Sequence, residues 1–255
     1  MVCVAASLRM RLASLPIYII SVAHFEERHE SIYSQLAVFS LKPEFIWEYD
    51  ADSLTDVDRK RCEGEVLPDK SISTVLKHIE AQHRLLESDF DWCLVLEDDA
   101  ILPSDFANKM ERVLSLVDGL EEACLVFLGG TDNRLDSRFF NSGSMTLLES
   151  PMTTAEAYLL NRRGCRERLK WLDAHTIDRP ADHFLKALDQ KLGITQFRVS
   201  EPFVSQGSIT GRFKTSLDTS RAKHGSRYLK LRFLWNRFRK QSLPRLLSKL
   251  RQSFK

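Results

Sequence analysis

The stretch Trp92–Ala100 restricts the possible folds of this chain more than any other part of its sequence. It consists of five apolar residues, Trp92–Leu96, followed by three acids, Glu97, Asp98 and Asp99. A continuous apolar run predicts a strand that is covered on both faces of a sheet. The acids then lie at the carboxyl end of that strand, which is the edge where open α/β sheets bind ligands. The sequence therefore predicts an α/β fold with an acidic ligand site at this edge.

Three adjacent carboxylates repel one another, and burying them without partners costs free energy. A divalent cation removes both penalties, and carboxylate oxygens suit Mg²⁺, Mn²⁺ or Ca²⁺ rather than zinc. We therefore expect Glu97, Asp98 and Asp99 to bind Mn²⁺ or Mg²⁺. A solvated acidic turn is the alternative interpretation, and the apolar strand directly before the acids favours the metal site.

The rest of the chain alternates between strand-like and helix-like patterns. The first 52 residues are predicted to form strand, helix and strand with acids at the carboxyl edge, which is typical of a nucleotide-binding α/β unit. Segments 53–70, 131–153 and 205–208 are expected to be irregular or loops, and Asn161 is expected to cap a helix. Strands are predicted at 15–22, 45–49, 123–128, 155–160 and 197–204, and helices at 24–39, 71–88, 103–117, 161–171 and from 178 onward.

Polar and small residues follow two of these strands. Asp50 and Asp52 end the second strand, where they are expected to contact a nucleoside, with a solvated loop as the alternative. Gly129 and Gly130 follow a later strand and would let the backbone approach a ligand closely, although an ordinary turn fits them equally well.

Cysteine usage and hydropathy indicate a cytoplasmic protein. The five cysteines form no C-x-x-C pair, and Cys93 and Cys124 lie inside apolar runs, as core residues do. This pattern fits a reducing compartment and argues against a disulfide framework or a zinc site. No apolar run approaches the roughly 20 residues of a membrane span. Arg9 and Arg11 interrupt the N-terminal stretch where a signal peptide needs its apolar region.

The charge of the chain is divided unevenly. Residues 221–255 contain 12 Lys and Arg and no Asp or Glu, which leaves 25 basic against 35 acidic residues in 1–220, a net charge of −10. We therefore expect two units, an acidic domain at 1–220 and a basic tail at 221–255.

The tail is expected to form amphipathic helices with two apolar stripes. A basic helix with such a stripe is typical of an interfacial membrane anchor, to which each basic residue near an anionic surface adds about 1 kcal/mol. Packing of the tail onto the domain is an alternative, and binding of single-stranded nucleic acid is a less favoured one. The stripes comprise Leu231, Leu234, Trp235 and Phe238, and then Leu246, Leu247, Leu250 and Phe254.

Four blocks of sequence occur in an order and spacing that span about residues 15 to 215. They are Ile17–Ser21 with Glu27, Arg28, Asp50 and Ala51; Leu94–Ala100 with Asp105 and Phe106; Ala157–Gly164; and Pro180–Leu185 with Pro202 and Gln206. In this arrangement the chain resembles glycosyltransferase family 25, the lipopolysaccharide and lipooligosaccharide galactosyltransferase family. One segment departs from the family pattern, because a Gly-Cys-x-x-Ser-His motif is replaced by Ser71–His78, in which only His78 matches.

The resemblance implies a GT-A-like fold, a Rossmann-like mixed sheet flanked by helices, and an enzyme that transfers a hexose. The expected donor is a UDP-sugar, typically UDP-galactose used with inversion by a β-galactosyltransferase, and the expected acceptor is a glycan or glycolipid such as lipopolysaccharide. Such an acceptor would place the protein on the inner face of the cytoplasmic membrane. The altered segment before His78 leaves a second interpretation open, a family member that binds a nucleotide sugar without transferring it. A basic-tailed nucleic-acid-binding protein is the third interpretation.

The resemblance also suggests roles for individual residues. Glu97 and Asp99 would hold the metal that stabilises the leaving diphosphate, with Asp98 contacting ribose or a metal-bound water. An inverting transfer needs a base, for which Asp182 is the first candidate and Glu156 and Asp178 are reserves. A plain helix-terminal acid is the alternative for Asp182.

Other residues are expected to contact the substrate. Arg28 would neutralise a phosphate, or else pair with an acid on its own helix, Glu26 or Glu30. His183 is expected to be structural or to contact the acceptor. The predicted substrate-binding residues are Ser21, Arg28, Asp50, Asp52, His78, Asp98, Gly129, Gly130 and Gln206.

Overall fold

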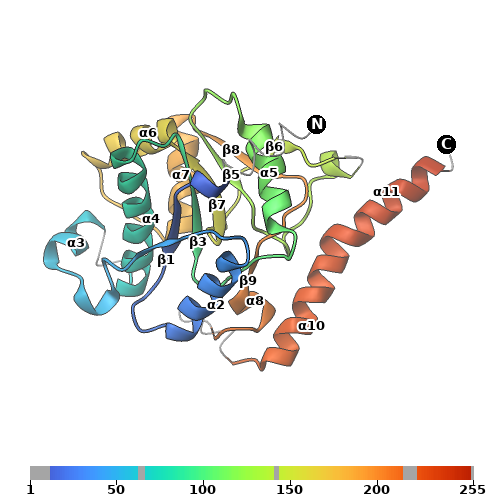
Figure 1. Ribbon diagram of the computed structural model, residues 1–255, viewed down its shortest axis with the longest axis horizontal. Helices are drawn as coiled ribbons and strands as arrows, with labels where there is room; N and C mark the ends of the chain where they lie inside the picture. Colours follow the sequence, from blue (N-terminus) through green and yellow to red (C-terminus); the bar gives the residue numbers. More distant parts are fainter. Residues whose placement is uncertain (1–11, 63–66, 141–143, 215–222, 254–255) are drawn as a thin grey trace.

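A computed structural model of the chain describes residues 12–62, 67–140, 144–214 and 223–253. Its centre is a seven-stranded sheet with helices on both faces, as Figure 1 shows. The strands, in spatial order, are β2 (Glu44–Ile46), β1 (Ile17–Ile20), β3 (Trp92–Glu97), β7 (Ala157–Asn161), β5 (Cys124–Phe127), β8 (Thr195–Val199) and β6 (Leu147–Glu149).

The sheet is mixed. β1 is parallel to both β2 and β3, whereas β7 is antiparallel to its neighbours β3 and β5. β8 is parallel to β5, and the edge strand β6 is antiparallel to β8. This architecture confirms the predicted α/β fold class with a mixed sheet flanked by helices.

The central strand β3 explains why its sequence is continuously apolar. Leu94 and Leu96 face one side of the sheet, where they join the core formed with two helices, α2 and α5. Cys93 and Val95 face the other side, which α4, α6 and α7 cover. These helices are α2 (Glu26–Ala37), α4 (Asp69–Glu87), α5 (Phe106–Val117), α6 (Arg162–Leu172) and α7 (Ala181–Leu192).

The ends of the strands place polar residues at one edge of the sheet. β1 and β3 are parallel with Ile20 opposite Glu97, so Ser21 and the acids after β3 emerge side by side. The antiparallel β7 begins at the same edge, and the Glu97 amide donates to the carbonyl of Glu156 at 3.0 Å. A two-stranded sheet of β4 (Ala100–Ile101) and β9 (Ser205–Gln206), followed by α8 (Gly207–Thr210), covers the acids.

Three expectations about loops and strand ends are corrected. Segment 53–70 contains α3 (Asp56–Arg61), which the Thr55 and Asp58 capping box begins, and the first residues of α4. Segment 205–208 forms β9 and the start of α8, which the pairing with β4 stabilises. The second strand is shorter than predicted, since Tyr49 has a φ of 65° that is incompatible with a strand. Two short 3₁₀ turns, η1 (Ala51–Ser53) and η2 (Ser137–Phe139), lie in the connections.

The tail forms one continuous helix along the body (Figure 1). It comprises α10 (Ser226–Arg237), a single π-helical turn η3 (Phe238–Ser242) and α11 (Leu243–Ser253). Leu229 and Phe233 are buried on the side that packs on α8, so the tail helix contacts the domain.

Several sequence features fall outside the described residues, namely Cys3, Arg9, Arg11, Phe254 and the predicted boundary at 220/221. The four cysteines within the described ranges are free and buried, including the expected core residues Cys93 and Cys124. None of the helices in the described residues combines the length and the apolar character that crossing a bilayer requires.

Candidate active site

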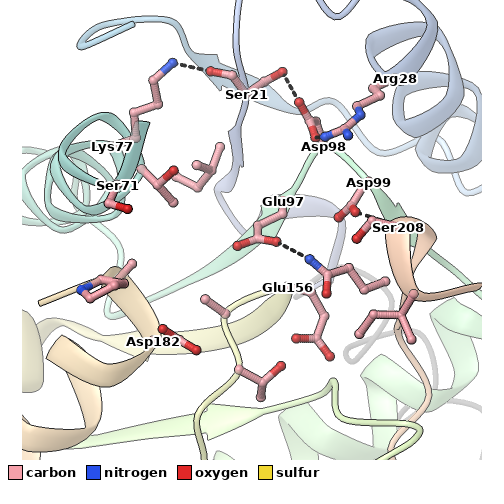
Figure 2. A pocket seen from close by; sticks show the side chains of 18 of the residues that line it. Ser21, Arg28, Ser71, Lys77, Glu97, Asp98, Asp99, Glu156, Asp182 and Ser208 are labelled. Atoms are coloured by element: carbon pink, nitrogen blue, oxygen red, sulfur yellow. Dashed lines mark hydrogen bonds and ion pairs between the residues drawn. The ribbon is translucent and has the colours of Figure 1, made fainter. Parts of the chain in front are cut away.

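A cleft with a cavity volume of about 330 Å³ opens at the sheet edge where Ser21 and the acids emerge. This volume is at the lower end of the range of small-molecule sites. The walls come from β1, α2, α4, the turn after β3, the segments 130–133 and 153–156, the start of α7 and the β9–α8 segment. Figure 2 shows the cleft with its acidic side chains at the centre.

Asp98 points toward α2, away from the other two acids of the motif (Figure 2). One of its oxygens accepts from Ser21 Oγ at 2.7 Å and the other from Arg28 Nη1 at 2.8 Å. Arg28 also donates to the carbonyl of Lys214 at 2.5 Å and lies 4.5 Å from the ring centroid of Phe25. Arg28 therefore lines the cleft through an ion pair with Asp98, rather than pairing with an acid of its own helix.

Glu97 and Asp99 are held by the β9–α8 segment. Gln206 Nε2 donates to Glu97 Oε2 at 3.1 Å, and the Ser208 amide donates to Asp99 Oδ2 at 3.1 Å. The other oxygen of Asp99, Oδ1, is buried and has no hydrogen-bond partner within the described part of the chain. Gln206, predicted to bind substrate, thus orients an acid of the cleft.

The electrostatics of this pair are unfavourable without a counter-ion. Burial, together with the charges of Asp98 and Asp182, raises the pKa of Glu97 to about 7. Burial, followed by the charge of Glu97, raises the pKa of Asp99 to about 7. A cation between them would relieve this repulsion and would satisfy the orphaned oxygen.

The acidic side chains of the cleft fit a divalent metal ion, with two carboxylates as its ligands. Among the described residues, no three His, Cys, Asp or Glu side chains converge as ligands, because Asp98 is engaged by Ser21 and Arg28. Glu97 and Asp99 therefore remain the expected ligand pair, whereas Asp98, the third member of the wider carboxylate set, is held by Ser21 and Arg28. A pair is sufficient for Mg²⁺ or a similar ion, which typically uses one or two carboxylates together with substrate phosphates and water.

Glu156 lies on the floor of the cleft and explains the two glycines after β5. Its Oε1 accepts from the Gly130 amide at 2.5 Å. A Cβ atom at Gly129 would lie only 2.2 Å from that oxygen. Burial raises the pKa of Glu156 to about 8, and the charges of Glu97 and Asp99 add to the effect. Gly129 thus makes room for a carboxylate of the protein itself and does not line the cleft, which corrects its predicted ligand contact.

Gly130 does line the cleft, and its backbone conformation favours glycine. Its φ is +79°, and a Cβ atom there would lie 2.5 Å from the Cε of Met152.

Asp182 occupies the opposite wall, in the first turn of α7, and its carboxylate points into the cleft (Figure 2). It is partly exposed, and its Oδ1 accepts from the His183 amide at 2.8 Å. Asp178, a reserve candidate, pairs with Arg179 at 2.6 Å and is not among the residues that line the cleft. His183 is exposed and does not line it either.

Besides Gly129, three more residues predicted to contact substrate lie outside the lining of the cleft. His78 is buried beneath Glu97, with Nδ1 2.6 Å from Tyr158 Oη and Nε2 3.7 Å from Glu97 Oε1. Burial lowers the pKa of His78 to about 4, so its ring is neutral at pH 7, and its Nε2 has no hydrogen-bond partner among the described residues. Asp52 is exposed in η1, whereas Asp50 accepts from Lys77 Nζ and from the Ala23 amide.

Sequence reasoning missed one wall of the cleft, the polar face of α4. Ser71, Thr74 and Lys77 recur at intervals of three and line the cleft together. Lys77 is buried and donates to the Ser21 carbonyl and to Asp50. The interval of three on the side opposite the apolar stripe is the signal that would have found them.

The comparison with protein families agrees with the blocks recognised in the sequence as far as residue 185. The family model described as "Glycosyltransferase family 25 (LPS biosynthesis protein)" matches residues 14–185, a range that includes Glu97, Asp99, Glu156 and Asp182. Among solved structures, the apo form of mouse xyloside xylosyltransferase 1 matches at 12% identity and a TM-score of 0.38. That match covers 74% of this chain and 77% of the other. A comparison with curated proteins finds no match.

Proposed function

The chain belongs to glycosyltransferase family 25, and we propose that it transfers galactose from UDP-galactose, with inversion, to lipopolysaccharide or a related surface glycan. Glycosyl transfer itself follows from the family. The observation that carries the finer proposal is the placement of the pair Glu97 and Asp99 at the sheet edge, facing Asp182 across one cleft.

Glu97 and Asp99 would hold Mn²⁺ or Mg²⁺ on the donor diphosphate. When bound, such an ion stabilises the charge that develops on the leaving diphosphate. Gln206 and the Ser208 amide fix the two carboxylates in place, so they lose little freedom on binding. Arg28 and Lys77 place two further cations on the cleft walls, where they favour an anionic donor.

The acceptor hydroxyl must lose a proton as the new glycosidic bond forms. Glu156 is poorly suited to accept it, since a carboxyl with a pKa of about 8 is mostly protonated at pH 7. Asp182 is partly exposed and points into the cleft, where an acceptor can reach it. We therefore assign Asp182 as the base and Glu156 as a buried hydrogen-bonding group of the cleft floor.

A donor screen tests this proposal. Purified protein is incubated with UDP-galactose, UDP-glucose and the UDP-N-acetylhexosamines, with a bacterial lipopolysaccharide extract as acceptor and with Mn²⁺ or a chelator, and released UDP is measured. Mn²⁺-dependent release from UDP-galactose alone is the expected result, and release from a different donor would replace galactose by that sugar. An Asp182→Asn variant should still bind UDP in calorimetry but should lose transfer.

The alternative is a family member that binds the nucleotide sugar without transferring it. The divergent segment Ser71–His78 favours this reading, since it forms part of a cleft wall. Calorimetric binding of UDP and Mn²⁺ without turnover of any donor, in the presence of a bacterial lipopolysaccharide extract, would identify such a member.

We also propose that the tail helix binds the anionic inner face of the cytoplasmic membrane. The support is an exposed apolar stripe on the face opposite the buried Leu229 and Phe233, about half a helical turn away. The 12 basic residues of 221–255 supply the complementary charge. The stripe consists of Leu231, Leu234, Trp235, Phe238, Leu246, Leu247 and Leu250, whose exposed fractions lie between 45% and 68%.

A further inference from the structure

Gln241 is a buried polar residue in an otherwise basic and apolar tail helix. It lies in the π-helical turn η3 and is 7% exposed. Its Nε2 donates to the carbonyls of Gly130, at 3.2 Å, and Asn133, at 3.0 Å. Turns of π-helix occur mostly as single insertions and often lie at functional sites. Here the turn places a side-chain donor on the segment that forms one wall of the cleft.

The wall segment, residues 130–135, lies between the cleft and the tail helix. Gly130, Asp132 and Asn133 line the cleft. Behind them, the Leu135 amide donates to the Lys240 carbonyl of the same π turn at 3.2 Å. The tail helix therefore makes three hydrogen bonds to this segment, two from Gln241 and one to Lys240.

The same segment determines where Glu156 lies. The Gly130 amide donates to Glu156 Oε1, and its carbonyl accepts from Gln241 and, at 3.3 Å, from Arg198. Gly130 thus joins the tail to the cleft floor through its own amide and carbonyl. A shift of Gly130 would move the amide that donates to the Glu156 side chain.

We infer that Gln241 is a positioning residue of the active site, which acts from the tail helix through Gly130 on Glu156 and on the 130–133 wall. The expected effect on kcat rests on the proposed function, whereas the expected effect on hydrogen exchange in the 130–135 segment does not depend on it. The tail is then a part of the cleft architecture as well as a membrane-binding element.

The test compares Gln241→Met, which keeps the side-chain length and removes the donor, with Arg239→Met in the same π turn. Arg239 is exposed, so its replacement controls for changes in the helix itself. Full-length proteins are examined by hydrogen exchange, thermal unfolding and kinetics of UDP release from the accepted donor.

In Gln241→Met we expect faster exchange at the amides of Gly130, Asn133 and Leu135, with no change in β5. We expect kcat to fall about fivefold and KM for the donor to change less than about twofold, because the wall loses the two hydrogen bonds from Gln241. Gln241→Met should unfold at a slightly lower temperature than Arg239→Met, because two hydrogen bonds of a buried side chain are lost, whereas Arg239→Met should match the wild type throughout.

Unchanged exchange in the 130–135 segment of Gln241→Met would overturn the inference, as would the same kinetic loss in Arg239→Met. A parallel fall in stability and in exchange protection across the whole sheet would assign Gln241 a purely structural role and would also overturn it. If the wild type turns over no donor, the proposed function fails, and the exchange comparison alone still decides the role of Gln241.

Discussion

Glu156 is the residue whose protonation depends most clearly on folding. Its pKa rises from 4.5 to about 8 because the carboxyl group is buried. Between these values the folded state keeps a proton that the unfolded state releases, so stability is lost as the pH rises through this window. A Glu156→Gln variant does not lose stability in this way. We therefore expect its unfolding temperature, minus that of the wild type, to become larger as the pH rises from about 5 to about 8.5.

The measurement is thermal unfolding in a chelating buffer at several pH values. Glu149→Gln is the matched control, since Glu149 is exposed on the edge strand β6. A pH-independent difference for Glu156→Gln, equal to that of the control, would show that Glu156 is ionised in the folded protein at neutral pH.

Asp99 combines a cost to folding with a proposed role in metal binding. Its orphaned Oδ1 and raised pKa destabilise the metal-free protein. Asp99→Asn should therefore unfold no lower than wild type in the presence of a chelator, yet bind Mn²⁺ in the presence of UDP at least about tenfold more weakly. Calorimetry and thermal unfolding measure the two effects, with Asp52→Asn on the exposed η1 turn as control. Equal Mn²⁺ affinity in wild type and Asp99→Asn would remove Asp99 from the metal site.

Residue types at the site could be predicted from the sequence, but their partners could not. The acids that directly follow an apolar strand predicted a charged edge of the sheet. Which acid stays available depends on Ser21 and Arg28, which engage Asp98, and on Ser208, which holds Asp99. These contacts join segments up to 109 residues apart, and no local pattern encodes such pairings.

At the scale of elements, the junction of β7 and α6 depends on one side chain. Asn161 Oδ1 accepts from the Gly164 amide at 2.8 Å, as a helix cap, and from the Cys124 amide at 3.0 Å. Its Nδ2 donates to the Glu122 carbonyl at 2.6 Å, so the cap also ties β5 to β7. We expect Asn161→Ala to lower the free energy of unfolding by about 2–4 kcal/mol, which sums a lost cap and two buried hydrogen bonds.

Urea unfolding measures this effect. Asn108→Ala, at an exposed position within α5, should change the free energy by less than about 0.5 kcal/mol. A loss at Asn161 no larger than that of the control would mean that water replaces the cap at no cost.

The cap of α6 was predictable because Asn precedes an amphipathic helix, and the long strands and helices were predictable from their periodicity. The short elements were not. β9 has two residues and α8 has four, too few for any period; β9 forms by pairing with β4 above the acids, and α8 follows it directly. The site depends on these short elements, so the part of the fold that sequence patterns describe least is the part that completes the cleft.

At the scale of the whole molecule, the sequence separates an acidic body from a basic tail, whereas the structure joins them. The buried side of the helix, with Leu229, Phe233 and Gln241, contacts the body. The opposite side carries the exposed stripe. The sequence left packing onto the body and membrane binding open as alternatives. Because one side of the helix is buried and the opposite side is exposed, the two are compatible.

Membrane binding by the exposed stripe is the last prediction. Leu234 and Trp235 are 50% and 61% exposed, and each large apolar side chain that enters a bilayer contributes about 1.5–3 kcal/mol. Leu234→Ser with Trp235→Ser should therefore weaken cosedimentation with vesicles of phosphatidylglycerol and phosphatidylcholine by at least about tenfold. Val38→Ser with Val57→Ser, which removes two apolar groups of the body that are even more exposed, at 77% and 69%, should have no effect. Binding should also weaken as salt rises from about 0.05 M to about 0.5 M, because screening reduces the basic contribution. Salt-insensitive binding to phosphatidylcholine alone would contradict the electrostatic part, and binding of single-stranded oligonucleotides without vesicle binding would assign the tail to nucleic acid instead.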